Sequence, residues 1–156
     1  MPSIQIRRSA LASPDAIQLL SELNLELSGA FPEPGATHFS LQDSQVAPGQ
    51  GAFVVAYLDD LAIGCGAIRR VDEATAELKR IYVRPSSRGQ GVGSSLVAAL
   101  EREARVLAVA RVVLETGNRL VPAIKLYESM GYVRIPLFGE YLSSPDTSIC
   151  FGKSLT

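Results

Sequence analysis

The chain has few of the residues that build metal, redox or membrane sites. Its 156 residues include two cysteines and one histidine, and Cys65 and Cys150 lack the spacing of metal or redox motifs. No apolar run approaches the roughly 20 residues that span a membrane, and residues 1–20 carry no signal-peptide pattern. We therefore expect no metal centre and no membrane span. We also expect a protein of the reducing cytoplasm, whose cysteines are small buried side chains.

Strong net charge is also missing, because the chain carries −1 at neutral pH. With 47% hydrophobic and 20% charged residues, the composition is typical of a globular protein, and we expect residues 1–156 to form a single domain. The charges are unevenly distributed. Residues 79–125 hold nine basic and three acidic side chains, whereas the remainder holds six and thirteen. This balance does not favour a nucleic-acid partner, but the basic block favours an anionic small ligand.

The most informative feature is a glycine-rich run at residues 88–93, Arg-Gly-Gln-Gly-Val-Gly, between an apolar strand and a helical repeat. Glycine permits unusual backbone angles and lets a ligand approach the main chain closely. A glycine-rich turn that enters a helix points unpaired N–H groups and the positive end of the helix dipole at one place. The run therefore predicts a binding site for a phosphate-bearing cofactor. The alternative is a helix with an ordinary glycine-rich entry loop.

Two common phosphate loops fit this run poorly. A nucleoside-triphosphate loop ends in Gly-Lys-Ser/Thr, but Gly93 is followed by serine rather than lysine. A dinucleotide loop needs Gly-x-Gly-x-x-Gly, and its third glycine position is Ser94 here. Glu115, at the end of the next strand, lies where a ribose-binding acid is expected. A dinucleotide-binding oxidoreductase is therefore weakened but stays open.

A third pattern, Arg/Gln-x-x-Gly-x-Gly/Ala, is met without exception by Arg88, Gly91 and Gly93. On this pattern the chain resembles the GNAT superfamily of N-acetyltransferases. Residues 77–85, Glu-Leu-Lys-Arg-Ile-Tyr-Val-Arg-Pro, are similar to the fourth strand of that superfamily, and residues 123–132, Ala-Ile-Lys-Leu-Tyr-Glu-Ser-Met-Gly-Tyr, to a later helix and the turn that leaves it. The resemblance covers somewhat over a third of the chain.

Periodicity predicts both helices and strands. Ser13-Pro14-Asp15 has the features of a helix start, and further helices are expected after the glycine loop and over 121–130. Strands are expected at 3–8, 52–58, 61–70, 75–84, 111–116, 132–135 and 147–153, with a long loop over 29–51. The resemblance implies an α+β fold of three layers (α/β/α), in which helices flank a mixed, mostly antiparallel sheet.

The resemblance also implies that acetyl-CoA is the cosubstrate. Loop amides would hold the pyrophosphate, and the backbone of the fourth strand would pair with the pantetheine arm. Carried over to this sequence, the cofactor-binding residues are Ile81, Tyr82, Val83, Arg88, Gly89, Gln90, Gly91, Val92, Gly93 and Ser94.

Two residues are candidates for the chemistry. Tyr127 matches the general-acid tyrosine of the superfamily and would protonate the leaving thiolate, which would increase the reaction rate about 10²-fold. The alternative is that Tyr127 is an aromatic packing residue. Glu77 is the candidate base, which would remove a proton from the amine through water. The alternative is that Glu77 is only a solvent-exposed glutamate on a strand. The superfamily often has an asparagine seven residues before the tyrosine. That position is Leu120 here, and the role is not transferred to Asn118.

The predicted function is acetyl-CoA-dependent acetylation of a primary amine on an unidentified small molecule or protein. The alternative is a non-catalytic module that binds CoA or a nucleotide. Segments 29–51 and 136–146 border the acceptor in this superfamily, and they contain Phe31, His38, Glu140 and Tyr141. We expect His38 to be a surface histidine. Homodimers are common among the proteins that this chain resembles.

Overall fold

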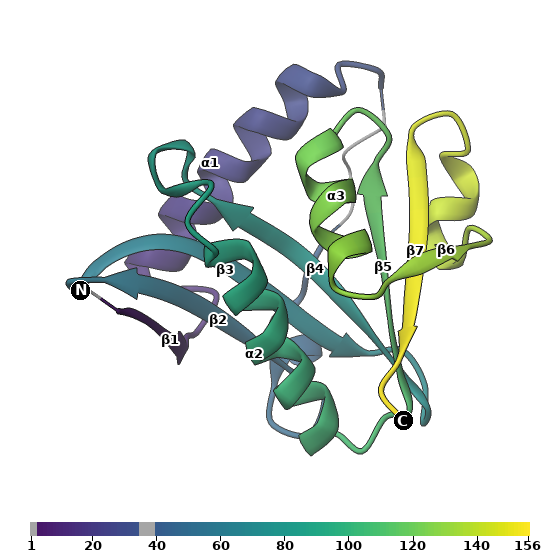
Figure 1. Ribbon diagram of the computed structural model, residues 1–156, viewed down its shortest axis with the longest axis horizontal. Coiled ribbons are helices and arrows are strands. Elements are labelled where there is room, and N and C mark those ends of the chain that lie inside the picture. Colours follow the sequence, from purple (N-terminus) through teal and green to yellow (C-terminus); the bar gives the residue numbers. More distant parts are fainter. Residues whose placement is uncertain (1–2, 35–39) are drawn as a thin grey trace.

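The computed structural model describes residues 3–34 and 40–156 (Figure 1). Over these residues the elements follow in the order β1 (Ile4–Arg8), α1 (Pro14–Ala30), η1 (Asp43–Val46), β2 (Gly51–Leu58), β3 (Leu61–Arg70), β4 (Thr75–Val83), η2 (Pro85–Ser87), α2 (Val92–Val106), β5 (Arg111–Gly117), α3 (Val121–Ser129), β6 (Val133–Ile135), η3 (Gly139–Ser143) and β7 (Ser148–Ser154), where η marks a 3₁₀ turn.

The described strands form one sheet in the order β1-β2-β3-β4-β5-β7-β6. Every neighbouring pair is antiparallel except β4 and β5, which run parallel. A parallel pair needs a crossover connection, and α2 supplies it between these two strands. The predicted mixed, mostly antiparallel sheet is confirmed.

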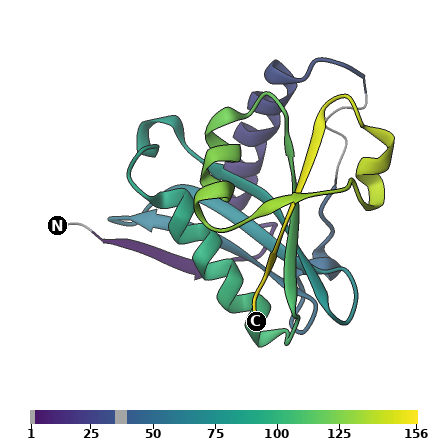
Figure 2. The same cartoon turned by 45° about the vertical axis from the view of Figure 1, so that its right-hand side comes forward.

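Helices cover both faces of the sheet, which gives the predicted three layers (Figures 1 and 2). On one face, Leu96 and Leu100 of α2 pack in a cluster with Val54, Ile68 and residues of α3. On the other face, buried residues of α1 pack against Phe53 and Val55 of β2. Burial of these apolar surfaces is the main favourable contribution to folding.

Local signals explain several element boundaries. The Ser13 hydroxyl accepts a hydrogen bond from the Ala16 N–H (3.1 Å), and Pro14 fills the first helical position of α1. Asp59 and Asp60 both adopt positive φ (48° and 66°), as the tight β2–β3 hairpin requires.

The expected loop over 29–51 contains secondary structure in two places. The helix α1 continues to Ala30, and Asp43–Val46 forms the turn η1. His38, which we expected at the surface, lies outside the described residues.

Both cysteines are free and buried, as expected. None of the described helices has the length and hydrophobicity needed to cross a bilayer.

Helix α2 provides a test of this packing. Leu100 has no exposed side-chain surface, whereas Val106 on the same helix is 75% exposed. Leu100→Ala should therefore lower the free energy of unfolding by about 2–5 kcal/mol, because it removes buried contacts and leaves a cavity. Val106→Ala is the matched control and should change it by less than about 0.5 kcal/mol. Urea titration followed by circular dichroism measures both, and equal effects would contradict the packing.

Candidate functional site

The site opens where two neighbouring strands separate. β4 and β5 pair from Thr75–Arg111 to Leu78–Leu114, and beyond that point β5 pairs only with β7. On its other side β4 has a bulge, because the register with β3 shifts between Cys65 and Ala67. A bulge bends its strand and increases the local twist, which turns the end of β4 away from β5.

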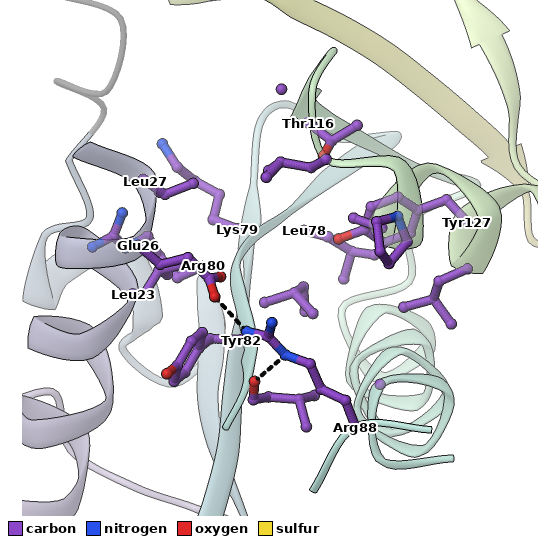
Figure 3. A pocket seen from close by; sticks show the side chains of 18 of the residues that line it. Leu23, Glu26, Leu27, Leu78, Lys79, Arg80, Tyr82, Arg88, Thr116 and Tyr127 are labelled. Atoms are coloured by element: carbon purple, nitrogen blue, oxygen red, sulfur yellow. Dashed lines mark hydrogen bonds and ion pairs between the residues drawn. The ribbon is translucent and has the colours of Figure 1, made fainter. Parts of the chain in front are cut away.

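The separated strands leave a cavity of about 640 Å³. Its walls come from β4, the glycine loop, the end of β5 and the helices α1 and α3 (Figure 3). Tyr141 of η3 also lines it. Because it runs between the two outer layers, one cavity touches every segment in which site residues were predicted.

The glycine loop forms one end of the cavity. Gly89 and Gly91 have positive φ (77° and 81°), and no described side chain caps the start of α2 at Gly91. The first hydrogen bond of the helix runs from the Ser95 N–H to the Gly91 carbonyl (3.0 Å), so the N–H groups of the preceding turn are left for a ligand. Such a turn binds phosphate well.

Nine of the ten predicted cofactor residues line the cavity: Ile81, Tyr82, Val83, Arg88, Gly89, Gly91, Val92, Gly93 and Ser94. Gln90 is exposed at the tip of the loop and does not line it. Gly93 also lies close to α3, because a Cβ there would lie 3.0 Å from Cδ2 of Leu126, whose side chain would have to shift.

Arg88 ties the loop to its surroundings. Its Nε donates to the Val83 carbonyl (2.8 Å), and its Nη2 bonds to Glu26 of α1 (2.6 Å), as the dashed lines in Figure 3 show. Ile81 and Tyr82 lie beyond the last β4–β5 pair, so their backbone edge toward β5 has no strand partner among the described residues. A ligand with amide groups can pair with such an edge as an added strand.

Tyr127 lies in α3 at the wall of the cavity, with its ring nearly buried. The ring packs edge-on against Tyr132 (6.0 Å between centroids) and near Phe151. Its hydroxyl makes no hydrogen bond to a described residue, yet no described buried side-chain polar atom lacks a partner. The hydroxyl is therefore open to the cavity. Burial, and after it the charge of Glu115, raises the Tyr127 pKa, so the phenol keeps its proton at neutral pH.

Glu115 is the first residue of β5 beyond the last β4–β5 pair, and it lines the cavity. Its carboxyl accepts a hydrogen bond from the Ser148 hydroxyl (2.6 Å). Burial raises the Glu115 pKa to about 7, and the hydrogen bond from Ser148 opposes this shift. Around neutral pH such a carboxyl exists in both forms and can accept a proton. The sequence offered it only as a ribose-binding acid.

Glu77 is fully buried, so the alternative of a solvent-exposed glutamate is wrong. It forms an ion pair with Arg69 (2.9 Å) and accepts a hydrogen bond from the Tyr141 hydroxyl (2.5 Å). Within the described part of the chain, Glu77 does not line the cavity. Its role as the base stays a prediction.

The two predicted acceptor segments meet at Lys79. The Lys79 ammonium bonds to Glu140 (3.0 Å) and to the Ser40 carbonyl (3.1 Å). Phe31 and Tyr141 both line the cavity, as do Lys79 and Arg80, which sequence reasoning did not select. Alternation along β4 could not identify these two, because the bulge changes which side chains face the opening.

The structure gives different places to the two residues considered for the asparagine role. Leu120 lines the cavity. Asn118 is exposed, and its side chain donates to the Asp146 carbonyl (2.9 Å).

Known proteins share this architecture. The acetyltransferase (GNAT) family model matches residues 16–132. The IAA acetyltransferase of Azospirillum brasilense is 32% identical over 93% of this chain and 94% of its own. A crystal structure from Klebsiella pneumoniae, named for an acyl-CoA N-acyltransferase, aligns with a TM-score of 0.84 at 31% identity, covering 98% of both chains.

An acetyltransferase of the same family from Elizabethkingia anophelis, solved with acetyl-CoA bound, aligns with a TM-score of 0.71 over 97% of this chain and 98% of its own. At 20% identity, this likeness shows the fold alone. The chain belongs to the acetyltransferase (GNAT) family, because the family model matches most of it and a relative of nearly equal length is 32% identical; its separated strand pair and glycine loop agree with this.

Proposed function

We propose that this cavity holds acetyl-CoA along the glycine loop and β4, with its thioester beside Tyr127 and Glu115. The chain is an acetyl-CoA-dependent N-acetyltransferase. One observation carries the assignment of the site: the uncapped start of α2, the unpaired edge of β4 and the open Tyr127 hydroxyl all face one cavity.

The acceptor amine must lose a proton before it attacks, since an alkylammonium has a pKa of about 10. The Glu115 carboxylate is placed to take this proton, directly or through water. Glu115 is better placed than Glu77, because it lines the cavity and has no ion-pair partner among the described residues.

The amine nitrogen then bonds to the thioester carbonyl carbon, and the carbonyl electrons move to oxygen. As the tetrahedral intermediate collapses, the C–S bond breaks and the thiolate receives the phenolic proton of Tyr127. The nitrogen, which still carries one proton too many, releases it to water in the cavity. Water in turn reprotonates Tyr127 and takes up the proton held by Glu115. The products are the acetylated amine and CoA.

A non-catalytic CoA-binding module would need the loop and the strand edge but not Tyr127 or Glu115. Release of free thiol from acetyl-CoA in the presence of primary amines separates the two functions. Binding of CoA without any amine-dependent thiol release would support the module and contradict the enzyme.

Two further properties are part of this proposal. We infer that the protein works in the reducing cytoplasm, which its two free buried cysteines support. We also infer a homodimer, because the edge strand β6 presents Val133 with 65% of its surface exposed and Leu142 of η3 is 66% exposed. Light scattering behind size-exclusion chromatography measures the oligomeric state.

Gly91→Ala tests the phosphate loop. Alanine at a φ of 81° is strained, so the loop should leave its binding geometry, and KM for acetyl-CoA should rise about tenfold. Gly49→Ala is a matched control, because Gly49 has the same φ and equally open space but does not line the cavity. Steady-state kinetics should show no KM change for the control. A similar rise in both variants would mean that general strain, not cofactor binding, is responsible.

Tyr127→Phe tests the proton donor. The change should lower kcat about 10²-fold, because the thiolate loses its acid, with little effect on KM for acetyl-CoA. Tyr132→Phe removes a hydroxyl that bonds to Glu101 instead (2.8 Å), so it should lower stability but leave kcat within about twofold. An unchanged kcat in Tyr127→Phe would mean that Tyr127 only packs against its neighbours and does not donate the proton.

Glu115→Gln tests the base. With a pKa of about 7, the Glu115 carboxyl is protonated and inactive in acid and becomes an active base as the pH rises through that value. In the unaltered protein, kcat/KM should therefore rise with pH along a limb centred near pH 7. Glu115→Gln should abolish this limb and lower kcat about 10²-fold.

Glu77→Gln is the comparison for that pH profile. It breaks the ion pair with Arg69 and should lower the free energy of unfolding by about 3 kcal/mol, yet keep a rising limb. Loss of the limb in Glu77→Gln but not in Glu115→Gln would assign the base to Glu77.

A further inference from the structure

One arginine in the cavity lacks an acidic partner. Three arginines line the cavity, and two of them form ion pairs: Arg88 with Glu26 and Arg119 with Glu33. In the described part of the chain, Arg80 forms no ion pair, and its side chain bonds only to the side-chain oxygen of Asn24 in α1.

An irregular backbone conformation positions the Arg80 guanidinium. Arg80 lies in the β4 bulge, has no β3 partner in the register, and adopts a φ of 61°, which is uncommon for a residue with a side chain. Burial lowers the Arg80 pKa, and the nearby Cys65 and Tyr141 oppose this shift. A partly buried cation without a counter-charge is costly, and an anionic ligand would offset that cost.

The guanidinium lies on the side of the cavity away from the proposed acid. Figure 3 shows Lys79 and Arg80 extending from β4 toward α1, near Leu23 and Leu27, whereas Tyr127 lies on the other side of the strand. Arg84 lies four positions after Arg80, about 13 Å along an extended strand, and the glycine loop begins only after η2, at Arg88. Arg80 is therefore remote from the predicted pyrophosphate site.

The other charges on this side are matched. Arg69 pairs with Glu77 and Lys79 pairs with Glu140. Of the charged side chains that line the cavity, two lack an oppositely charged ion-pair partner among the described residues: the Arg80 guanidinium and the Glu115 carboxyl. A cleft with one free cation and one free carboxyl is complementary to a molecule that carries both a carboxylate and an ammonium group.

We propose that the acceptor is an amino acid with an apolar side chain, that Arg80 binds its carboxylate, and that its amine faces Glu115. The cavity wall formed by Leu23, Leu27 and Phe31 provides an apolar surface for that side chain. This inference rests on the proposed function, because it names the acceptor of the same site.

The experiment compares matched acceptors with and without a carboxylate. L-Leucine, L-methionine and L-phenylalanine are each paired with their decarboxylated amine: 3-methylbutylamine, 3-(methylthio)propylamine and 2-phenylethylamine. Thiol release is measured for the unaltered protein and for Arg80→Gln, Arg80→Lys and Arg102→Gln. Arg102 is exposed on α2 and does not line the cavity, so its variant is the control.

For the unaltered protein, we expect kcat/KM to be at least about tenfold higher for an amino acid than for its amine. Arg80→Gln should lower kcat/KM for the amino acids by about 10–100-fold, mainly through KM, because a charge-assisted hydrogen bond to the carboxylate is lost. The loss for the matched amines should be at least about tenfold smaller. Arg80→Lys keeps the charge and should recover part of the activity, and Arg102→Gln should match the unaltered protein.

A binding measurement avoids any dependence on turnover. The melting temperature of the protein saturated with CoA should rise with N-acetyl-L-leucine, N-acetyl-L-methionine or N-acetyl-L-phenylalanine, and this rise should disappear in Arg80→Gln. Equal preference for amines and amino acids, or no rise with any of the three acids, would overturn the proposal.

Two other outcomes have distinct meanings. If Arg80→Gln weakens CoA binding in calorimetry by more than about tenfold, Arg80 serves a cofactor phosphate and the acceptor proposal is wrong. If the unaltered protein binds CoA but acetylates no amine in the panel and none of the acids stabilises it, the acceptor class is wrong. The proposed function itself fails only if CoA does not bind or if no primary amine releases thiol.

Discussion

The divergence of β4 from β5 is the constraint on which the rest of the structure depends. Sheet pairing normally satisfies the N–H and C=O groups of a strand, and leaving them unpaired is costly unless water or a ligand replaces the lost partner. Here the β4–β5 pairing ends at Leu78 and Leu114, just before the bulge at Arg80, and the cavity begins at this point. A cofactor with amide groups can supply the missing partner. The same defect therefore creates the space for a ligand and part of the free energy for binding it.

Charge is organised around this opening in a consistent way. Most acidic and basic side chains in the cavity walls are matched within the protein, as Arg88 is with Glu26 and Lys79 is with Glu140. Matched pairs hold the walls in place but offer little to a ligand. The unmatched groups are the amides at the start of α2, the Glu115 carboxyl and the Arg80 guanidinium, and each faces a different part of the proposed reactants.

Some of this could be predicted from the sequence and some could not. The glycine loop and the strand before it were predictable, because three glycines in five residues at a helix start have a direct backbone consequence. Tyr127 came from the resemblance, and the structure places it at the cavity wall. Arg80 and Glu115 gained their positions from a shift in strand register and from the point where pairing ends, which are properties of the folded sheet. Glu77 could not be judged as buried, because Arg69, its partner, lies on a different strand.

Glu77 still influences the reaction centre in this arrangement. Its negative charge is one of the causes that raise the Glu115 pKa, although burial is the largest of them. Arg69 and the Tyr141 hydroxyl hold Glu77 in place, and Tyr141 also lines the cavity. A ligand that moves Tyr141 would weaken a hydrogen bond to Glu77 and change the field at Glu115. The ion pair with Arg69 and the hydrogen bond from Tyr141 give a partner to each carboxylate oxygen of Glu77, which explains how a glutamate can occupy the fully buried position on β4.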